Sequence, residues 1–363
     1  MSLLIVSFLT SLLVTFAVVR SDRLHGGLSA DHDLSGPQKF HALPVPRIGG
    51  LGVFVAVVLG TVFAQIADIG AAREAWLLVA CSLPAFLSGI AEDLTKSVSP
   101  RRRLFFTAVS ASLGCWLLGA VLRRSDIPGL DYLITMAPFA VALTLLCVAG
   151  VANAVNIIDG FNGLASMCVL MMLGGLAYVA FQVDDTLVAS MALICAGAVL
   201  GFFVWNFPAG LIFLGDGGAY FLGFMVAELS VLLIARHVEV SPLFPLLACA
   251  YPIFETIFTM YRRKFVRGVA TGAPDGIHLH TLIHRRLIRP NLAGPPERRQ
   301  TLRNSMTSPY LWVLCLLSIV PSVLWWNSTR ILTGFLLLFM LSYVWLYSRI
   351  VRFRTPKWLG FPR

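Results

Sequence analysis

Long apolar runs dominate the chain and are separated by short polar segments. Each run has about the ~20 residues that a helix needs to cross the hydrocarbon core of a bilayer. The runs lack the period-two alternation of membrane β-strands, which are only about 10 residues long. The pattern predicts an all-α, polytopic membrane helical bundle with about eleven spans, at 2–19, 48–69, 75–91, 104–122, 132–151, 164–182, 186–204, 218–235, 241–260, 309–326 and 331–350.

The composition supports this fold class. Of the 363 residues, 58% are hydrophobic and only 13% are charged, whereas soluble domains carry about 25% charged residues. Such a chain has too little polar surface to cover itself in water. A secreted soluble domain, a soluble enzyme and a nucleic-acid-binding module are therefore excluded.

The net charge of +10 follows from the topology of the chain. If the N-terminus is outside, 23 of the 28 Lys and Arg residues fall on the inside, in the segments 20–47, 92–103, 261–308 and 349–363. This asymmetry is the positive-inside rule, and it predicts an outside N-terminus and a cytoplasmic C-terminus. The first run lacks a basic start and a small-residue cleavage site, which indicates a retained span.

The inside loops hold nearly all of the polar chemistry, so we expect the working face to be cytoplasmic. The chain contains no long linker or repeat and is treated as a single membrane-embedded domain, 1–363. We expect its catalytic loops at about 20–47, 92–103, 152–163, 205–217 and 261–308.

Two adjacent carboxylates, Glu92 and Asp93, lie at the inner end of the third span, close to Lys96 and the run Arg101–Arg103. Carboxylates at the end of a span are often only solvated caps. The arginines fit a topogenic cluster about as well as a substrate site. A topogenic cluster does not explain why two acids are adjacent.

Three polar residues with a spacing of three, Asn153, Asn156 and Asp159, occupy one sector of a helix. A polar face at membrane depth usually looks into a cavity or a site, although a structural polar stripe is the alternative. Gly160 and Gly163 follow and allow the backbone to approach a ligand closely.

Asp216 lies in a glycine-rich stretch just before the eighth span. It is either a turn residue that caps the helix or a hard oxygen ligand in a loop that admits a bulky phosphate. In the large basic loop, His278, His280 and His284 have a spacing that zinc could accept. No cysteine or carboxylate cluster completes a zinc site there, and nearby arginines favour anionic oxygens as the ligand.

Carboxylate and amide oxygens on several inside loops suit Mg²⁺, which keeps waters and binds substrate phosphates; Mn²⁺ is the alternative ion. Basic and histidine groups add charge-assisted contacts to phosphate. Together these groups indicate phosphoryl transfer at the membrane surface, with a lipid as one substrate.

At these motifs the sequence resembles the polyprenyl-phosphate N-acetylhexosamine-1-phosphate transferases, and bacterial undecaprenyl-phosphate GlcNAc-1-phosphate transferases above all. The resemblance covers residues from about 33 to 286 and keeps the order of the motifs. It rests on the stretches at Gly36–Gly50, Glu92–Asp93, Asn153–Leu164, Phe213–Gly218 and Asp275–His280.

The resemblance implies transfer of a sugar 1-phosphate from a UDP-N-acetylhexosamine to undecaprenyl phosphate, which gives the undecaprenyl-diphosphate sugar and UMP. UDP-GlcNAc is the favoured donor, and UDP-QuiNAc or UDP-FucNAc is the alternative. The reaction would start a cell-envelope glycan such as the O-antigen of lipopolysaccharide, at the bacterial cytoplasmic (inner) membrane.

By the same resemblance, Asn156 and Asp216 would hold Mg²⁺ on the donor pyrophosphate. Asp93, with Glu92, would orient or deprotonate the lipid phosphate, and Asp159 would shape the nucleotide and metal site. Asn162 would face the uracil. The remaining substrate contacts are expected from Lys39, Lys96, Arg102, Arg103, Asn153, His278 and His280.

Three positions depart from the family pattern. Glu92 replaces the usual first Asp, Asn162 stands where many bacterial members have Asp, and Thr281 replaces a further His. The route of transfer, direct or through an enzyme-linked intermediate, stays open, as does a homodimer. A membrane transporter is the rival class, but it predicts acids within the spans, whereas the motif acids cluster at their inner ends.

Overall fold

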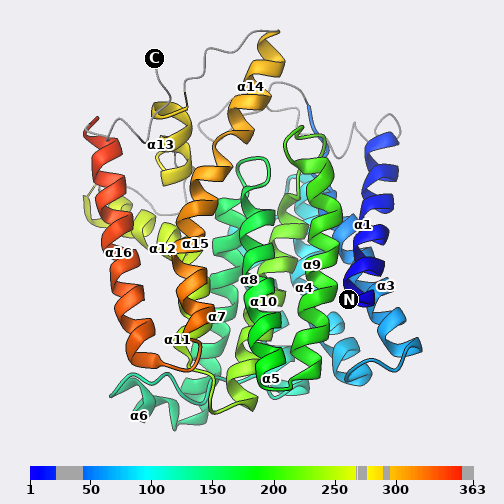
Figure 1. Cartoon of the computed structure of the whole chain (residues 1–363), viewed down its shortest axis with the longest axis vertical. Coiled ribbons are helices and arrows are strands. Elements are labelled where there is room, and N and C mark those ends of the chain that lie inside the picture. The colour runs from blue at the N-terminus through cyan, green and yellow to red at the C-terminus, as the bar shows by residue number, and fades with distance from the viewer. Residues whose placement is uncertain (22–43, 267, 269–275, 289–294, 354–363) are drawn as a thin grey trace.

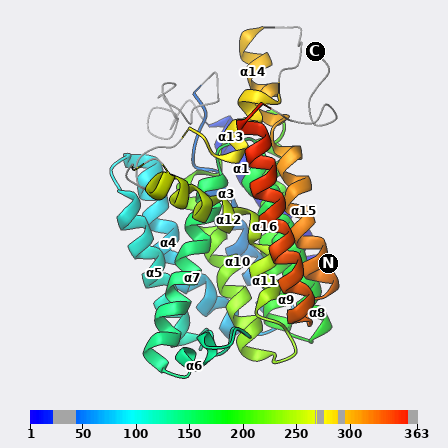
Figure 2. The same cartoon turned by 90° about the vertical axis from the view of Figure 1, so that its left-hand side faces the viewer.

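Most of the long helices of the computed structural model run back and forth along one direction, so the connections between them lie at the two ends of a bundle (Figures 1 and 2). The structure describes residues 1–21, 44–266, 268, 276–288 and 295–353. The first seven helices along these residues are α1 (Ser2–Arg20), α3 (Gly49–Ile66), α4 (Ala72–Thr95), α5 (Pro100–Leu117), α6 (Leu130–Ile134), α7 (Ala137–Ile158) and α8 (Leu164–Gln182).

The second half of the chain continues in the same way. Its elements are α9 (Thr186–Asn206), α10 (Gly215–Arg236), α11 (Leu243–Ala248), α12 (Ala250–Tyr261), the π-helical turn η1 (Arg262–Val266), α13 (Leu279–Arg286), α14 (Pro296–Ser305), α15 (Ser308–Leu324) and α16 (Thr329–Val351). No β-strand occurs among the described residues. The predicted fold class, an all-α polytopic membrane protein, is confirmed.

Nine helices in the described ranges are long and apolar enough to cross a membrane: α1, α3, α4, α7, α8, α9, α10, the continuous α14–α15 segment and α16. The two other predicted spans, 104–122 and 241–260, coincide with helices that do not reach this measure alone. α5 opens on three arginines, and 241–260 is divided into α11 and α12 at Cys249. The division has a local cause, because Pro252 has no N–H to donate to the carbonyl of residue 248. The count of eleven spans stays a prediction.

The centre of the bundle is α10, which is buried along nearly its whole length. It packs against α3, α4, α7, α8 and α9. Since its first turn lies among the loops that carry the polar motifs, the most enclosed helix of the fold also supports the candidate site.

Glycines let α3 and α4 approach the first turn of α10. A Cβ added to Gly89 would lie 2.5 Å from the Cα of Gly217, and one added to Gly50 would lie 2.3 Å from the backbone N of Gly218. No side chain fits between these helices, so the glycines fix how closely α10 is held.

We expect Gly89→Ala to destabilise the protein by about 1–3 kcal/mol, because the added methyl group has no space and the helices must separate. Thermal unfolding in detergent measures the change. Gly174→Ala on α8 is the control, since a Cβ there meets nothing within 4 Å. Equal unfolding temperatures for the two variants would contradict the close contact.

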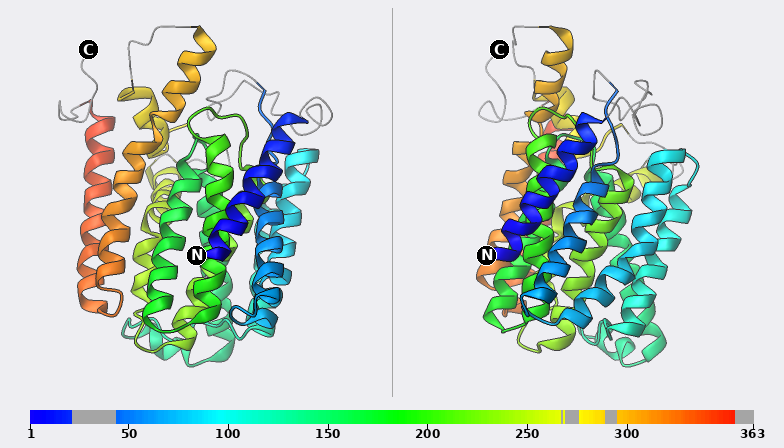
Figure 3. Two further views of the ribbon diagram at one scale, coloured as in Figure 1. Left: turned by 45° about the vertical axis from the view of Figure 1, so that its right-hand side comes forward. Right: turned by 90° about the vertical axis from the view of Figure 1, so that its right-hand side faces the viewer.

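The described parts of the predicted cytoplasmic segments gather at one end of the bundle. The connections after α4, α7 and α9 lie at the end that carries α13 and α14, at the top of Figure 1, and the last turn of α16 lies there too (Figure 3). We call this the α13 end. Connections that are far apart in the sequence therefore meet around one region.

Candidate active site

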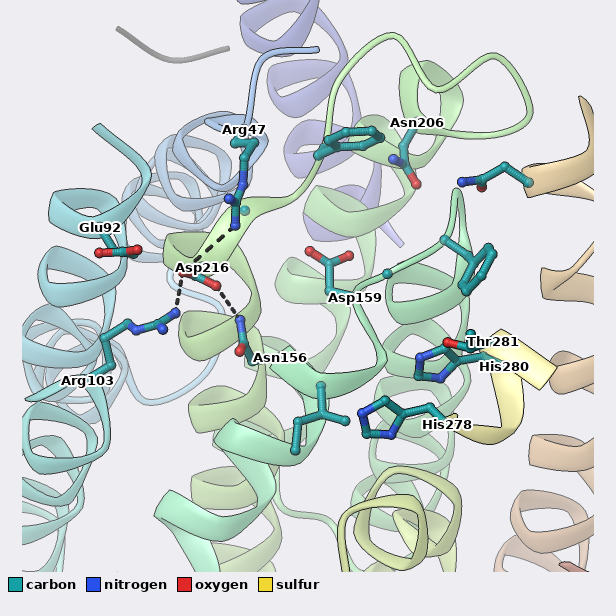
Figure 4. A pocket seen from close by; sticks show the side chains of 16 residues that line it. Arg47, Glu92, Arg103, Asn156, Asp159, Asn206, Asp216, His278, His280 and Thr281 are labelled. Atoms are coloured by element: carbon teal, nitrogen blue, oxygen red, sulfur yellow. Dashed lines mark hydrogen bonds and ion pairs between the residues drawn. The ribbon is translucent and has the colours of Figure 1, made fainter. Parts of the chain in front are cut away.

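A polar pocket of about 370 Å³ opens at the α13 end (Figure 4). Its lining comes from the segment before α3, the ends of α4, α5, α7, α9 and α14 that lie here, the α7–α8 and α9–α10 connections, and the starts of α10 and α13. The sixteen lining residues are Arg47, Glu92, Arg103, Asn156, Ile157, Asp159, Gly160, Phe161, Asn206, Phe213, Gly215, Asp216, His278, His280, Thr281 and Asn304.

Asp216 is presented by the first turn of α10. Gly215, with φ of 76°, makes the turn into the helix, and a Cβ there would collide with the carbonyl oxygen of Arg47 and with the side chain of Asp93. The backbone N–H groups of Asp216 and Gly217 donate to the two carboxylate oxygens of Asp93, each over 2.9 Å. Asp93 therefore caps α10 from another helix and satisfies amides that a helix start leaves unpaired.

The Asp216 carboxylate is the meeting point of the pocket's charges. Its Oδ1 accepts a hydrogen bond of 2.6 Å from the side-chain amide of Asn156, and its Oδ2 pairs with the guanidinium of Arg103. A nitrogen of Arg47 lies 3.9 Å from the same Oδ2, and another lies 3.8 Å from Asp93. Two arginines from different elements thus surround one carboxylate and balance the charge of the acids at this point of the pocket.

Asp159 lies just past the end of α7 and points toward the centre of the pocket (Figure 4). It is partly buried. Burial raises the pKa of this carboxyl to about 7, although the nearby Arg47 opposes the shift. Near neutral pH it can therefore exist with or without its proton.

The opposite wall of the pocket carries two histidines. The rings of His278 and His280 stack with their centroids 5.0 Å apart, and Phe161 packs edge-on against His280 at 5.5 Å. Burial lowers the pKa of His280 to about 3, so its imidazole is neutral at physiological pH. Nδ1 of His278 lies 3.0 Å from the carboxylate of Glu255 on α12.

The structure brings together most of the predicted site residues. Glu92, Arg103, Asn156, Asp159, Asp216, His278 and His280 line one pocket, and Asp93 lies directly beneath it. The side chain of Asp93 has no exposed surface and both of its oxygens accept backbone N–H groups. Its geometry is that of a residue that positions Asp216, and the contact with the lipid phosphate stays a prediction.

Four predicted substrate contacts in the described part of the chain, Lys96, Arg102, Asn153 and Asn162, do not line the pocket. Lys96 and Arg102 are exposed and do not line the pocket. Asn153 accepts a hydrogen bond from Tyr220 over 3.2 Å and faces a separate apolar cavity. Lys39 falls outside the described residues.

Asn162, the fourth of these residues within the described part, is buried between the loop and the α14–α15 junction. Its backbone N–H donates to Asn304 over 2.8 Å, its side-chain amide donates to Ser305 over 3.0 Å, and its carbonyl accepts from Ser308 over 2.6 Å. The predicted contact with uracil has a physical obstacle, since these bonds hold Asn162 outside the pocket lining.

Nine of the sixteen lining residues were not among the expected site residues, and two of these, Arg47 and Asn304, show what the sequence could and could not signal. Arg47 belongs to one of the quoted motifs, so a basic residue beside two glycines was a signal for it. Asn304 had no signal, because it lies in a basic stretch 142 residues after Asn162, which it contacts. Only the folded chain brings these two segments together.

The donor set fits a hard divalent ion better than zinc. In the described part of the chain, no group of three or more His, Cys, Asp or Glu side chains could hold a metal ion by itself. Mg²⁺ needs fewer protein ligands, because it is usually bound by one or two carboxylates and completes its coordination shell with water and substrate phosphates. The Asp216 carboxylate and the nearby Asp159 meet that requirement, and the amide oxygen of Asn156 could join them if its NH₂ group turned away from Asp216.

The chain matches known proteins in this region. Residues 75–234 match the family model described as glycosyl transferase family 4. The chain is 30% identical over 280 residues to a probable undecaprenyl-phosphate N-acetylglucosaminyl 1-phosphate transferase of Bacillus subtilis (strain 168), which covers 76% of this chain and 75% of the relative.

Two further relatives also match this chain over most of their length. An undecaprenyl-phosphate alpha-N-acetylglucosaminyl 1-phosphate transferase of Thermotoga maritima is 27% identical over 280 residues, or 77% of this chain and 79% of the relative. A phospho-N-acetylmuramoyl-pentapeptide-transferase of Oceanobacillus iheyensis is 30% identical over 244 residues, or 63% and 74%.

Proposed function

Since this chain belongs to glycosyl transferase family 4, as a multi-pass membrane enzyme of the polyprenyl-phosphate sugar-phosphate transferase type, we propose that it transfers an N-acetylhexosamine 1-phosphate from a UDP-sugar to undecaprenyl phosphate. UDP-GlcNAc is the proposed donor. The observation that carries the proposal is a polar pocket, built around Asp216, that lies directly beside an apolar cavity of about 730 Å³.

The two cavities share their walls. Arg103 lines the polar pocket and the next residue, Leu104, lines the apolar cavity; on α7 the same relation holds for Asn156 and Asn153, one turn apart. The apolar cavity continues between α5, α7, α10 and α12 toward the opposite end. A lipid whose phosphate enters the polar pocket could therefore lay its chain along this cavity.

The apolar cavity opens sideways, toward the surrounding lipid. Three side chains in its lining, Leu146, Ile257 and Met260, are 69%, 55% and 50% exposed on the outer surface of the bundle. Moving an isoprenoid chain from water into apolar surroundings is favourable by about 0.8 kcal/mol for each buried CH₂ group. The chain therefore stays within apolar surroundings throughout. A lateral opening lets it remain there while the head group reacts.

The proposed reaction is a substitution at phosphorus. An oxygen of the lipid phosphate forms a bond to the phosphorus that carries the sugar, and the bond from that phosphorus to the bridging oxygen of UMP breaks. UMP leaves with the electron pair. The products are the lipid diphosphate sugar and UMP.

Each residue of the pocket has a role in this proposal. Arg47 and Arg103 would attract the phosphates, His278 and His280 would hydrogen-bond their oxygens, and Asp159 would accept a proton from a lipid phosphate that arrives protonated. Asn156 and Asp216 would hold Mg²⁺. The bound ion would supply positive charge to the pyrophosphate and weaken the bond to the leaving group.

We place the protein in the bacterial cytoplasmic membrane with the α13 end in the cytoplasm. Most of the Lys and Arg residues in the described part of the chain lie in segments at this end, in agreement with the positive-inside rule. UDP-sugars are made in the cytoplasm, so this orientation also gives the pocket its donor. We propose that the product starts a cell-envelope glycan.

The test is nucleotide release. Purified protein is incubated with undecaprenyl phosphate, Mg²⁺ and a panel that includes UDP-GlcNAc, UDP-QuiNAc and UDP-FucNAc. We expect UMP only when lipid and metal are both present, and the best donor identifies the sugar. Release of UDP would show transfer of the sugar without its phosphate. If no nucleotide is released from any donor, the result would contradict the transferase and favour a membrane transporter.

A side chain that fills the apolar cavity should weaken the binding of the lipid acceptor and leave the binding of the UDP-sugar unchanged. Gly150 on α7 lines the apolar cavity and has open space where a side chain would begin. We expect Gly150→Phe to raise the KM for undecaprenyl phosphate about tenfold or more, with the KM for the UDP-sugar unchanged. The control is Gly174→Phe on α8, which also has open space but lies outside the cavity. A raised donor KM, or equal effects of both variants, would contradict the groove.

A further inference from the structure

We propose that the last helix, α16, positions the histidine wall of the pocket, although none of the sixteen lining residues belongs to it. This inference rests on the proposed function, because it assigns α16 a part in binding the donor phosphates. Two tyrosines one turn apart, Tyr343 and Tyr347, make the connection. A spacing of four places them on one face of the helix.

The first connection runs through a buried carboxylate. Glu255 on α12 has no exposed surface and accepts three hydrogen bonds. Nδ1 of His278 and the backbone N–H of Leu279 meet its Oε1, over 3.0 and 3.1 Å, and the hydroxyl of Tyr343 donates to its Oε2 over 2.7 Å. The carboxylate is therefore a bridge between α16 and the start of α13.

This bridge determines which ring nitrogen of His278 carries the hydrogen and which one faces the pocket. Nδ1 also lies 3.2 Å from the hydroxyl of Thr259, which can donate or accept, but the carboxylate can only accept a hydrogen bond, so Nδ1 carries the hydrogen. Nε2 is then the ring nitrogen that faces the pocket, and in the imidazolium form, which carries a hydrogen on both ring nitrogens, it can donate to a phosphate oxygen while Glu255 balances the charge of the ring. A carboxylate that holds the far nitrogen of a histidine is the usual way to fix the orientation of the ring.

The second connection holds the backbone just before His278. A guanidinium nitrogen of Arg262 donates to the carbonyl of Ile277 over 3.0 Å and to the hydroxyl of Tyr347 over 2.8 Å. The Tyr347 hydroxyl in turn lies 3.3 Å from the same carbonyl. The carbonyl that precedes His278 is thus fixed from α16 as well.

The third connection holds the other end of α13. Arg286, in the last turn of α13, donates to the carbonyls of Ile350 and Val351 over 2.8 and 2.7 Å. These carbonyls belong to the final turn of α16, where a helix has no partners of its own for them. The segment 278–286 is therefore bound to α16 at both ends.

Ring packing makes this connection stiff. The Tyr343 ring meets Phe254 and Phe258 of α12 edge-on, with centroids 4.9 and 5.5 Å apart, and Tyr347 meets Phe258 at 4.8 Å. Such contacts hold the tyrosine rings in place, so their hydroxyls reach the network at no further cost in side-chain freedom. Removing only a hydroxyl should leave this packing intact.

Tyr343→Phe tests the role of α16. We expect kcat/KM for the UDP-sugar to fall about tenfold, mainly through a higher KM, as is usual when an outer partner of a site residue is lost. Thermal unfolding should change little. Tyr178→Phe on α8 is the matched control, because it removes a hydroxyl from a half-exposed tyrosine far from the pocket, and it should retain wild-type kinetics.

A double-mutant cycle separates positioning from general support. If Tyr343 acts through Glu255 and His278, then Tyr343→Phe should cost less than about twofold once His278→Gln is present. Dissociation constants for UDP-GlcNAc, measured by calorimetry on the same four proteins, give the same comparison where turnover is too slow to follow.

The outcomes are distinct. Equal losses in both backgrounds would overturn the positioning role and leave α16 as ordinary support. Wild-type kinetics for Tyr343→Phe would also overturn it, while the transfer reaction stands. Absence of UMP release from the wild-type protein would instead overturn the proposed function, and the role of α16 with it.

Discussion

Asp216→Asn should reduce turnover by more than about 10²-fold while the protein stays folded and membrane-inserted. The substitution keeps the shape of the side chain but removes the charge that pairs with Arg103 and Arg47 and that we propose holds Mg²⁺. An amide also directs an NH₂ group at donors that need an acceptor. UMP release at saturating substrates measures the loss.

Asp184→Asn is the control for this substitution. Asp184 is exposed, lies in the α8–α9 connection at the opposite end of the bundle and has φ of 56°, a conformation that Asn adopts readily. Its activity and unfolding temperature should equal those of the wild-type protein. Turnover by Asp216→Asn within tenfold of wild type would remove Asp216 from the metal assignment.

Asp93→Asn should be nearly as damaging, for a different reason. The two oxygens of Asp93 each accept a backbone N–H at the start of α10, and an amide has only one oxygen to offer. One buried N–H then loses its partner, which costs about 1–3 kcal/mol. Because these amides carry Asp216, we expect turnover to fall by about 10²-fold and the unfolding temperature to fall with it.

Glu92→Asp provides the comparison with Asp93→Asn. Glu92 lines the pocket and its Oε2 accepts from the backbone N–H of Val98 over 2.6 Å. A side chain shorter by one methylene loses that bond but keeps its charge, so turnover should fall less than tenfold. If Asp93→Asn lowered turnover without any loss of stability, a direct contact between Asp93 and substrate would replace the capping role.

The helices could be predicted well because the bilayer imposes a length on them. Every predicted span coincides with a helical segment, including the two that the structure shortens or divides. The division at Cys249 was harder to predict, since Pro252 is tolerated within many membrane helices and the apolar run continues across it.

The polar residues near the end of α7 show what helical spacing can predict about the site and what it cannot. Asn153, Asn156 and Asp159 were expected on one face, but α7 ends at Ile158. Past that point the chain turns, which brings Asp159 beside Asn156, whereas Asn153 stays at the level of the apolar cavity. The spacing identified the right region, and the end of the helix decided which residues share the pocket.

The remaining differences depend on contacts between distant segments. Asn162 is held by the residues at 304–308, and Asp93 is enclosed by the start of α10. Neither contact leaves a pattern in the local sequence. The sequence therefore indicated which acids and amides matter, but it could not distinguish a residue that touches substrate from one that holds such a residue in place.

Because the apolar cavity opens sideways, the acceptor concentration that sets the rate is its concentration within the bilayer. An acceptor that never leaves the bilayer meets the protein by diffusion in two dimensions, so the rate depends on its mole fraction among the surrounding amphiphiles. Adding detergent at a fixed total amount of undecaprenyl phosphate should then slow the reaction, as in surface-dilution kinetics. In a cell, the supply of sugar-linked lipid would follow how crowded the membrane is with carrier.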